Sequence, residues 1–231
     1  GAIQPIDKIA QLAHSSGALF HTDAVQAVPY LKIDIRKSKV DFLSLSAHKF
    51  HGPKGMGLAY IDRKHAIEPI IDGGEQQYGI RSGTFNVPGI VGMAEALFLA
   101  YKERDKHVKH IKTLRDYMLN QMQKQIEDIH LNGSLNNRTP NNLNIRFENI
   151  EGEAIVMDLS DKGICAGTGS ACSSKKLSSS HVLKSIGLKK EHLNSNVRFT
   201  PGKFTTKKEI DYTLSQLKKT VARLRDFSPI K

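Results

Sequence analysis

Apolar residues follow two alternating patterns along this chain. Spacing of three or four residues predicts helices over residues 5–14, 90–122 with a break near 103–105, 153–160, 182–186 and 207–224. Short apolar runs predict strands over residues 18–21, 40–45, 57–61, 130–131, 142–147, 164–166 and 197–200. This alternation indicates an α/β fold.

The pattern of predicted elements changes at the longest predicted helical segment, residues 90–122. A glycine-rich polar loop over residues 72–83 precedes that segment, and strands and shorter helices begin again after it. We therefore expect two domains, one over residues 1–105 and one over residues 106–231.

Charge and composition narrow the possible functions. Among 231 residues, 34 Lys and Arg face 23 Asp and Glu, so the formal charge is +11. Such an excess suits a nucleic acid, an acidic protein or simply a basic surface. The basic residues are scattered and no nucleic-acid-binding motif accompanies them, which argues against nucleic acid. No apolar run reaches the ~18 residues that span a bilayer, so we expect no membrane partner. Two cysteines cannot form a disulfide framework, and we expect a reducing, cytoplasmic location.

A lysine and an aspartate follow two successive predicted strands. Lys49 lies in Ser46-Ala47-His48-Lys49, directly after one strand, and Asp23 lies at the end of the strand before it. Ligands of open α/β sheets bind at the carboxyl ends of strands. A lysine can form a Schiff base with pyridoxal phosphate, and an aspartate can pair with its ring nitrogen. Ser46 and His48 can donate to the phosphate, and Gln26, one turn beyond Asp23, to the ring hydroxyl.

The two cysteines differ in setting. Cys172 lies among small residues in Gly-Ser-Ala-Cys-Ser-Ser, beside Lys175 and Lys176, which would favour a reactive thiolate. An incidental cysteine is the alternative. Cys165 lies in the predicted strand 164–166, where we expect a buried, small apolar side chain. Their spacing matches no zinc motif, so we expect no metal site.

Two arginines complete the candidate residues. Arg198 ends a predicted strand, and its guanidinium could bind the carboxylate of an amino-acid substrate through two hydrogen bonds. Arg81, in the glycine-containing loop Arg-Ser-Gly-Thr, could hold a phosphate. A surface arginine is the alternative for Arg198.

Together these segments resemble the cysteine desulfurases of the NifS/IscS type, which are fold-type I pyridoxal phosphate enzymes. The resemblance rests on HTDAVQA (21–27), SLSAHKFHGPKGMG (44–57), IRSGTFNVPGIVGMAEA (80–96), GTGSACSSKKLSSSHVLKSIG (167–187) and VRFTPGKFTTKKEID (197–211). It implies a C-terminal fragment, with part of the large-domain sheet in residues 1–105. Residues 106–231 would form a small α+β C-terminal domain with a mobile cysteine loop.

The resemblance implies a role for each cofactor-binding residue. Lys49 would hold pyridoxal phosphate covalently and move the Cα proton of the substrate. Asp23 would pair with the ring nitrogen and Gln26 with the ring oxygen, while Ser46 and His48 would bind the phosphate. His48 would also contribute to catalysis.

It also implies substrate and partners. Arg198 would bind the carboxylate of L-cysteine, and Cys172 would take its sulfur as a persulfide, leaving L-alanine. The persulfide would pass to a sulfur-acceptor protein such as an iron–sulfur scaffold. Thr84 would reach the cofactor of a second subunit, so we expect a homodimer.

Two other functions remain open at this point. A selenocysteine lyase or related pyridoxal phosphate lyase could use the same residues. A fragment lacking part of the cofactor site could instead be a non-catalytic interaction module.

Overall fold

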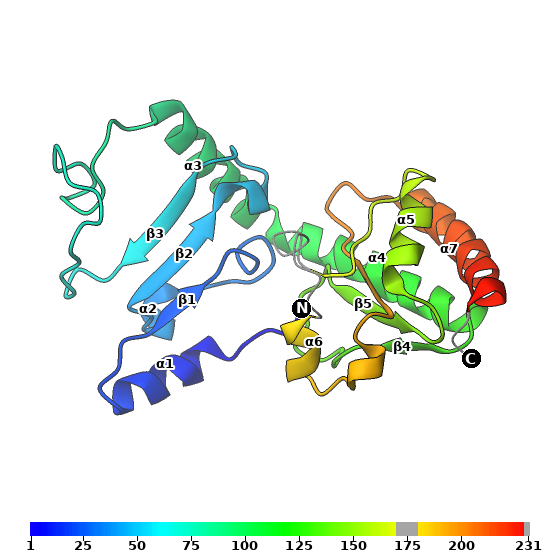
Figure 1. The fold of residues 1–231 in the computed structure, drawn as a ribbon. Helices are drawn as coiled ribbons and strands as arrows, with labels where there is room; N and C mark the ends of the chain where they lie inside the picture. The colour runs from blue at the N-terminus through cyan, green and yellow to red at the C-terminus, as the bar shows by residue number, and fades with distance from the viewer. Residues whose placement is uncertain (170–179, 229–231) are drawn as a thin grey trace. The chain divides into compact units, whose positions relative to one another are not determined.

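The computed structural model describes residues 1–169 and 180–228, which form two compact units (Figure 1). The N-terminal unit comprises Gln4–Lys106, and the C-terminal unit comprises Gly1–Ile3 and His107–Lys231. The sequence predicted a division near residue 105, and the units divide between Lys106 and His107.

The N-terminal unit contains a three-stranded sheet in the order β1-β2-β3. β1 (His21–Asp23) is parallel to β2 (Phe42–Ser46), and β3 (Gly57–Ile61) is antiparallel to β2. Its other elements are α1 (Ile6–Ser15), α2 (Ile35–Ser38), the 3₁₀ turn η1 (Ala47–Phe50) and α3 (Val87–Lys102). The apolar core is formed by Ala24, Val28, Val40, Leu43, Ala47, Phe50 and Met93.

A local signal explains where α3 begins. The Asn86 side chain accepts a hydrogen bond from the Gly89 amide and caps α3, and a proline lies in the first turn. α3 ends at Lys102, and α4 (Arg104–Gln125) begins two residues later. The predicted break near residues 103–105 is therefore confirmed.

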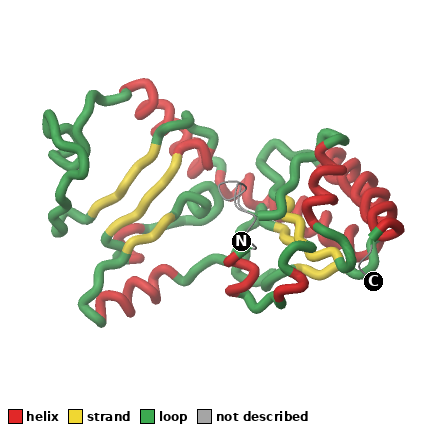
Figure 2. The backbone as a smooth tube through the Cα atoms, in the orientation of Figure 1, coloured by secondary structure: helices red, strands yellow, loops and turns green. Residues whose placement is uncertain are grey.

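The C-terminal unit contains a second sheet, whose strands are yellow in Figure 2. Its order is β4-β5-β6, and neighbouring strands are antiparallel. Its strands are β4 (Ile129–Leu131), β5 (Leu143–Phe147) and β6 (Asn196–Phe199). Besides α4, its helical elements are α5 (Gly152–Ser160), α6 (His181–Ser185), η3 (Lys190–His192) and α7 (Lys207–Phe227).

The two faces of this second sheet differ in character. Leu143, Ile145 and Phe147 alternate along β5 and are fully buried in the main core of the unit. That core also contains side chains from α4, α5 and α7. Asn144 and Arg146 point from β5 to the opposite face, because successive residues of a strand face opposite sides.

The predicted strand over residues 164–166 is wrong, and so is the predicted burial of Cys165. The Ile164 amide donates to the Leu159 carbonyl at 3.0 Å, which closes the end of α5, and Ile164 is buried. Gly163 supplies the left-handed backbone (φ 72°) that this closure requires. Cys165 follows the closure and is exposed.

One N-terminal strand is displaced from its prediction. Residues 18–20, predicted as strand, connect α1 to the sheet, and the Ala18 amide donates to the Ala13 carbonyl. β1 begins only at His21. No helix in the described ranges is long and apolar enough to cross a membrane.

Candidate active site

Two predicted site residues end neighbouring strands at one edge of the N-terminal sheet. Asp23 is the last residue of β1 and Ser46 the last residue of β2. The strands are parallel, with Asp23 in register with Ser44, so both carboxyl ends meet at this edge. The Ala24 amide donates to the Ser44 carbonyl at 3.0 Å and holds the chain there as it leaves β1.

Lys49 lies in the η1 turn that follows β2 at this same edge. The turn is anchored by two buried side chains, Ala47 and Phe50. The Ala47 amide donates to the Met56 carbonyl at 3.0 Å, and the Gly52 amide donates to the Ala47 carbonyl at 2.8 Å. These bonds fix the backbone that carries Lys49.

Gly52 is required by this packing. A Cβ atom at Gly52 would lie 2.9 Å from the Cβ of Ala47 and 3.3 Å from that of Ala96 in α3. The first distance is shorter than real Cβ contacts, so any side chain here would displace the turn.

The polar side chains around Lys49 present donors and a free amine. Ser46 Oγ and His48 Nδ1 are 2.9 Å apart and hydrogen-bonded. Lys49 is half-buried and forms no hydrogen bond or ion pair with the described residues. Asp23 is exposed and accepts a hydrogen bond from the Val25 amide at 3.0 Å. The donor set thus offers an amine for an aldehyde, a carboxylate for a protonated ring nitrogen and donors for a phosphate. This chemistry fits pyridoxal phosphate.

Three further predicted residues belong to loops of this unit. Gln26 is exposed in the turn after β1, and Thr84 is exposed in the loop before α3. Arg81 Nη1 donates to the Ser82 carbonyl at 2.8 Å, so part of its hydrogen-bonding capacity is already used.

Arg198 lies in β6 of the C-terminal unit. Its backbone forms a bridge with Gly167: the Arg198 amide donates at 2.6 Å and the Gly167 amide at 3.2 Å. Arg198 Nε is buried and has no acceptor in the described part of the chain. Arg146, on the same face of the sheet, also has a buried Nε without an acceptor in the described part of the chain, but its Nη2 lies 2.5 Å from Glu148 Oε1. Among the described residues, the Arg198 side chain has no carboxylate partner such as Arg146 has, so its guanidinium could bind an external anion.

Cys172, the predicted nucleophile, lies outside the described residues. The described chain ends before it at Gly169, shortly after the bridge to Arg198, and resumes at Ser180.

The sequence reasoning missed Asn144. This residue pairs in register with Arg198 across β5 and β6, on the polar face of the sheet. The alternation of Leu143, Ile145 and Phe147 with polar residues placed Asn144 on that face, but nothing in the sequence gave its partner.

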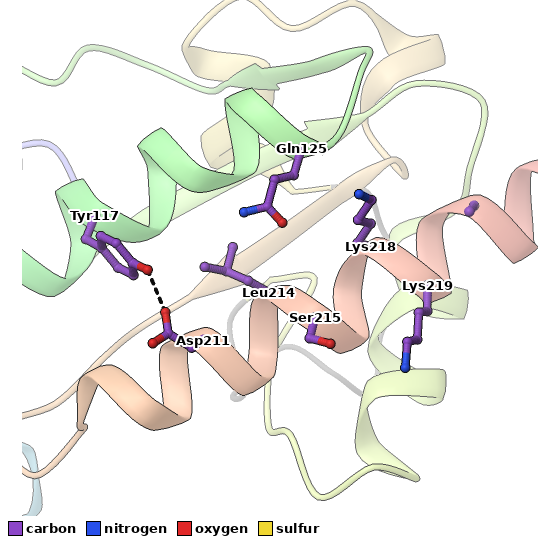
Figure 3. Close-up of a pocket in the computed structure, with 8 residues that line it drawn as sticks. Tyr117, Gln125, Asp211, Leu214, Ser215, Lys218 and Lys219 are labelled. Atoms are coloured by element: carbon purple, nitrogen blue, oxygen red, sulfur yellow. Dashed lines mark hydrogen bonds between the residues drawn. The ribbon is translucent and has the colours of Figure 1, made fainter.

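One groove of the described structure contains none of the predicted site residues (Figure 3). It has a volume of about 560 Å³ and lies between α4 and α7, lined by Tyr117, Gln125, Asp211, Leu214, Ser215, Lys218, Lys219 and Ala222. Tyr117 Oη donates to Asp211 Oδ1 at 2.6 Å, so two of its polar groups are paired. Within residues 1–169 and 180–228, no group of three His, Cys, Asp or Glu side chains could hold a metal ion.

This chain is similar to a protein-family model, to known proteins and to solved structures. The family model described as aminotransferase class-V matches residues 1–213. The cysteine desulfurase IscS of Dictyoglomus turgidum is 45% identical over 231 residues, which is all of this chain and 59% of that protein. A solved structure of a NifS-like protein superposes with a TM-score of 0.87 at 35% identity and covers 97% of this chain. The structure of SspA in complex with cysteine superposes with a TM-score of 0.68 at 30% identity and covers 89%. The chain spans less than three fifths of each of these proteins, 59%, 58% and 56% respectively.

Proposed function

Because the chain belongs to the class-V aminotransferase family, we propose that it forms part of a pyridoxal phosphate-dependent cysteine desulfurase. The reaction converts L-cysteine and the Cys172 thiol into L-alanine and a Cys172 persulfide. The C–S bond of cysteine breaks, an S–S bond forms at Cys172, and the thiol proton replaces sulfur on the alanine methyl group, so no external oxidant or reductant is needed.

One observation carries this proposal: Lys49, Ser46 and Asp23 share the carboxyl edge of two parallel strands. Ligands of open α/β sheets bind at such an edge. The amine of Lys49, which pairs with none of the described residues, would hold the cofactor. The hydrogen-bonded Ser46 and His48 would hold its phosphate.

These residues have distinct tasks in the proposed reaction. When bound, pyridoxal phosphate supplies an electron sink for charge that develops at the substrate Cα. Asp23 keeps a proton on the ring nitrogen, and Gln26 donates to the ring oxygen. Lys49 removes the Cα proton and later returns one. Arg198, whose Nε has no acceptor among the described residues, would bind the substrate carboxylate.

The proposal extends to partners and location. The C-terminal unit holds 21 of the 34 Lys and Arg and 12 of the 23 Asp and Glu, so it carries +9 of the +11 formal charges. This excess supports an acidic sulfur-acceptor protein, such as an iron–sulfur scaffold. The exposed Thr84 would reach the cofactor of a second subunit in a homodimer. A reducing cytoplasm would keep Cys172 ready to react.

Cofactor attachment is the first test. The protein is incubated with pyridoxal phosphate, its visible spectrum is recorded, and the adduct is reduced with borohydride and mapped to a peptide. We expect a single modified lysine, Lys49, which Lys49→Ala abolishes. Lys54→Ala, an exposed lysine five residues on, serves as the control and keeps the adduct. Modification scattered over surface lysines would contradict the proposed site.

Product analysis tests the reaction itself. We expect equal amounts of L-alanine and protein-bound persulfide from L-cysteine, with the persulfide lost in Cys172→Ser while the Lys49 adduct remains. Selenocysteine turnover without cysteine turnover would favour the lyase alternative. A cofactor adduct without any turnover by the intact protein would favour a non-catalytic role.

A further inference from the structure

Three asparagines on the polar face of the β4-β5-β6 sheet orient one another. Asn132, directly after β4, donates through Nδ2 to Asn144 Oδ1 and to Asn196 Oδ1, each at 2.6 Å. Asn196 Nδ2 in turn donates to the His192 carbonyl at 2.5 Å. A carbonyl oxygen can only accept, so this last bond fixes which end of each amide is oxygen. The Asn144 amide therefore turns its oxygen to Asn132 and its NH₂ group away.

Asn144 lies directly opposite Arg198. The Arg198 backbone bonds to Gly167, on the side away from β5, and the Asn144 carbonyl accepts from the Asn132 amide on the β4 side. Asn144 and Arg198 are therefore a non-hydrogen-bonded pair. In such pairs the Cα atoms approach to about 4.5 Å and the side chains lie closest together.

This pair presents hydrogen-bond donors without an acceptor. Neither the NH₂ group of Asn144 nor the buried Nε of Arg198 has an acceptor among the described residues. Arg146, on the same face, has an unpaired Nε of the same kind among the described residues, but its Nη2 already pairs with the Glu148 carboxylate. A guanidinium beside a fixed neutral donor, with no carboxylate opposite, suits a single carboxylate.

We propose that Asn144 is a second carboxylate-binding residue, whose NH₂ group donates to the α-carboxylate that Arg198 binds. Asn132 is a positioning residue, because it holds the Asn144 amide with its donors free. The inference rests on the proposed function, which supplies an α-amino acid as the substrate class. The two carboxylate contacts, from Asn144 and from Arg198, would make the site select amino acids over amines with the same side chain.

The test compares two ligands of the intact, cofactor-loaded protein by titration of its visible spectrum. L-Alanine carries the carboxylate, and ethylamine, the amine with the same side chain, lacks it. Asn144→Ala should raise the dissociation constant of L-alanine about 10-fold to 100-fold, the effect of losing a hydrogen bond to a charged group. The dissociation constant of ethylamine should stay within about 2-fold of wild type, since only the carboxylate contact is lost. Asn120→Ala, an exposed asparagine of α4, is the control and should change neither.

Two further variants test whether the Asn144 amide itself contacts the carboxylate and whether Asn132 orients that amide. Asn144→Asp keeps the acceptor for Asn132 but pairs with Arg198, so it should weaken L-alanine binding more than Asn144→Ala. Asn132→Ala frees the Asn144 amide to rotate and should give a smaller, still alanine-specific rise.

Three results would overturn the inference. The first is unchanged L-alanine binding in Asn144→Ala while Asn144→Asp loses it, which would make Asn144 only a neighbour of Arg198. The second is an equal rise in the dissociation constants of both ligands in Asn144→Ala. The third is unchanged L-alanine binding in Asn144→Val, the variant to use if Asn144→Ala does not fold, because a β-branched residue supports the strand without a donor. Wild-type turnover of L-cysteine tests the proposed function separately, and L-alanine binding still tests Asn144 if that turnover is absent.

Discussion

Asp41 links its own segment, before β2, to three other segments of the N-terminal unit, and replacing it by asparagine should cost that unit much of its stability. Its side chain is 1% exposed. Oδ2 accepts from His14 Nε2 in α1 at 2.7 Å and from the Phe20 amide before β1 at 2.8 Å. Oδ1 accepts from His65 Nε2 at 2.7 Å and lies 3.0 Å from Lys64 Nζ, both beyond β3.

The magnitude follows from the geometry of these donors. An asparagine in place of Asp41 would offer one acceptor oxygen, and its NH₂ group would face two donors whichever way the amide turned. Lys64 is 57% exposed and can turn to water, whereas His65 and the Phe20 amide cannot do so freely. Losing charge-assisted bonds here and leaving a buried donor unpaired costs about 3–5 kcal/mol. That is a large share of the roughly 5–15 kcal/mol that typically stabilises a domain.

Urea unfolding followed by far-UV circular dichroism at pH 7 measures this cost. Asp62→Asn is the matched control, because Asp62 also contacts Lys64, at 3.1 Å, but is 32% exposed. It should unfold almost as wild type does. A loss below about 1 kcal/mol in Asp41→Asn would refute the reasoning, because a buried carboxylate that joins these segments must cost more.

The same variant should reveal the titration of Asp41. Burial alone would raise the pKa of this carboxyl, but the hydrogen bonds from His14, His65, Phe20 and Lys64 outweigh it and hold the pKa far below its usual range. A carboxyl with a lowered pKa stabilises the fold above its unfolded pKa and loses that contribution as the pH falls. The difference in the free energy of unfolding between wild type and Asp41→Asn should therefore narrow by about 1.4 kcal/mol per pH unit below roughly pH 3.9. A constant difference from pH 7 to pH 3 would contradict the assigned ionisation.

Three other substitutions, two of them with a control variant, test the packing and helix capping of the two units. Phe147→Ala removes a fully buried ring and should lower the free energy of unfolding by about 3–5 kcal/mol, whereas Phe227→Ala, at an exposed ring, should change it little in the same urea titration. Thr206→Ala removes the cap of α7 and should cost about 1 kcal/mol by thermal melting, while Thr206→Ser should retain most of it. Gly52→Ala should displace the η1 turn and slow the borohydride-trapped labelling of Lys49, and unchanged labelling would show that the turn tolerates a Cβ atom.

Elements with strong periodicity and local end signals were predictable from the sequence. The strand predicted over residues 57–61 is β3, and the helix predicted over residues 207–224 lies within α7. α7 begins where Thr206 and Glu209 form a reciprocal capping box, a signal carried by residues three apart. Such signals need no knowledge of the rest of the fold.

Elements that depend on tertiary contacts were not predictable in this way. Residues 164–166 are apolar enough for a strand, but the Ile164 amide is used to close α5, and Cys165 faces outward. The η1 turn has four residues, too few for a helical pattern, and the Met56 carbonyl and Gly52 amide hold it in place. The sequence therefore identified Lys49 as a candidate without giving the turn that positions it.

The candidate site shows the same division between local and distant information. Asp23, Ser46 and Lys49 were predictable because each follows a short apolar strand, and parallel pairing of β1 and β2 brings those strand ends to one edge. Asn144 carries no such signal, because its partner Arg198 lies on a strand far along the chain. Alternation gives the face of Asn144, but only the register of β5 and β6 gives its neighbour. A shift of one residue in that register would move Arg198 to the apolar face, where Val197 and Phe199 now lie buried. Burial of those two side chains is therefore what fixes the donor pair on the polar face of the sheet.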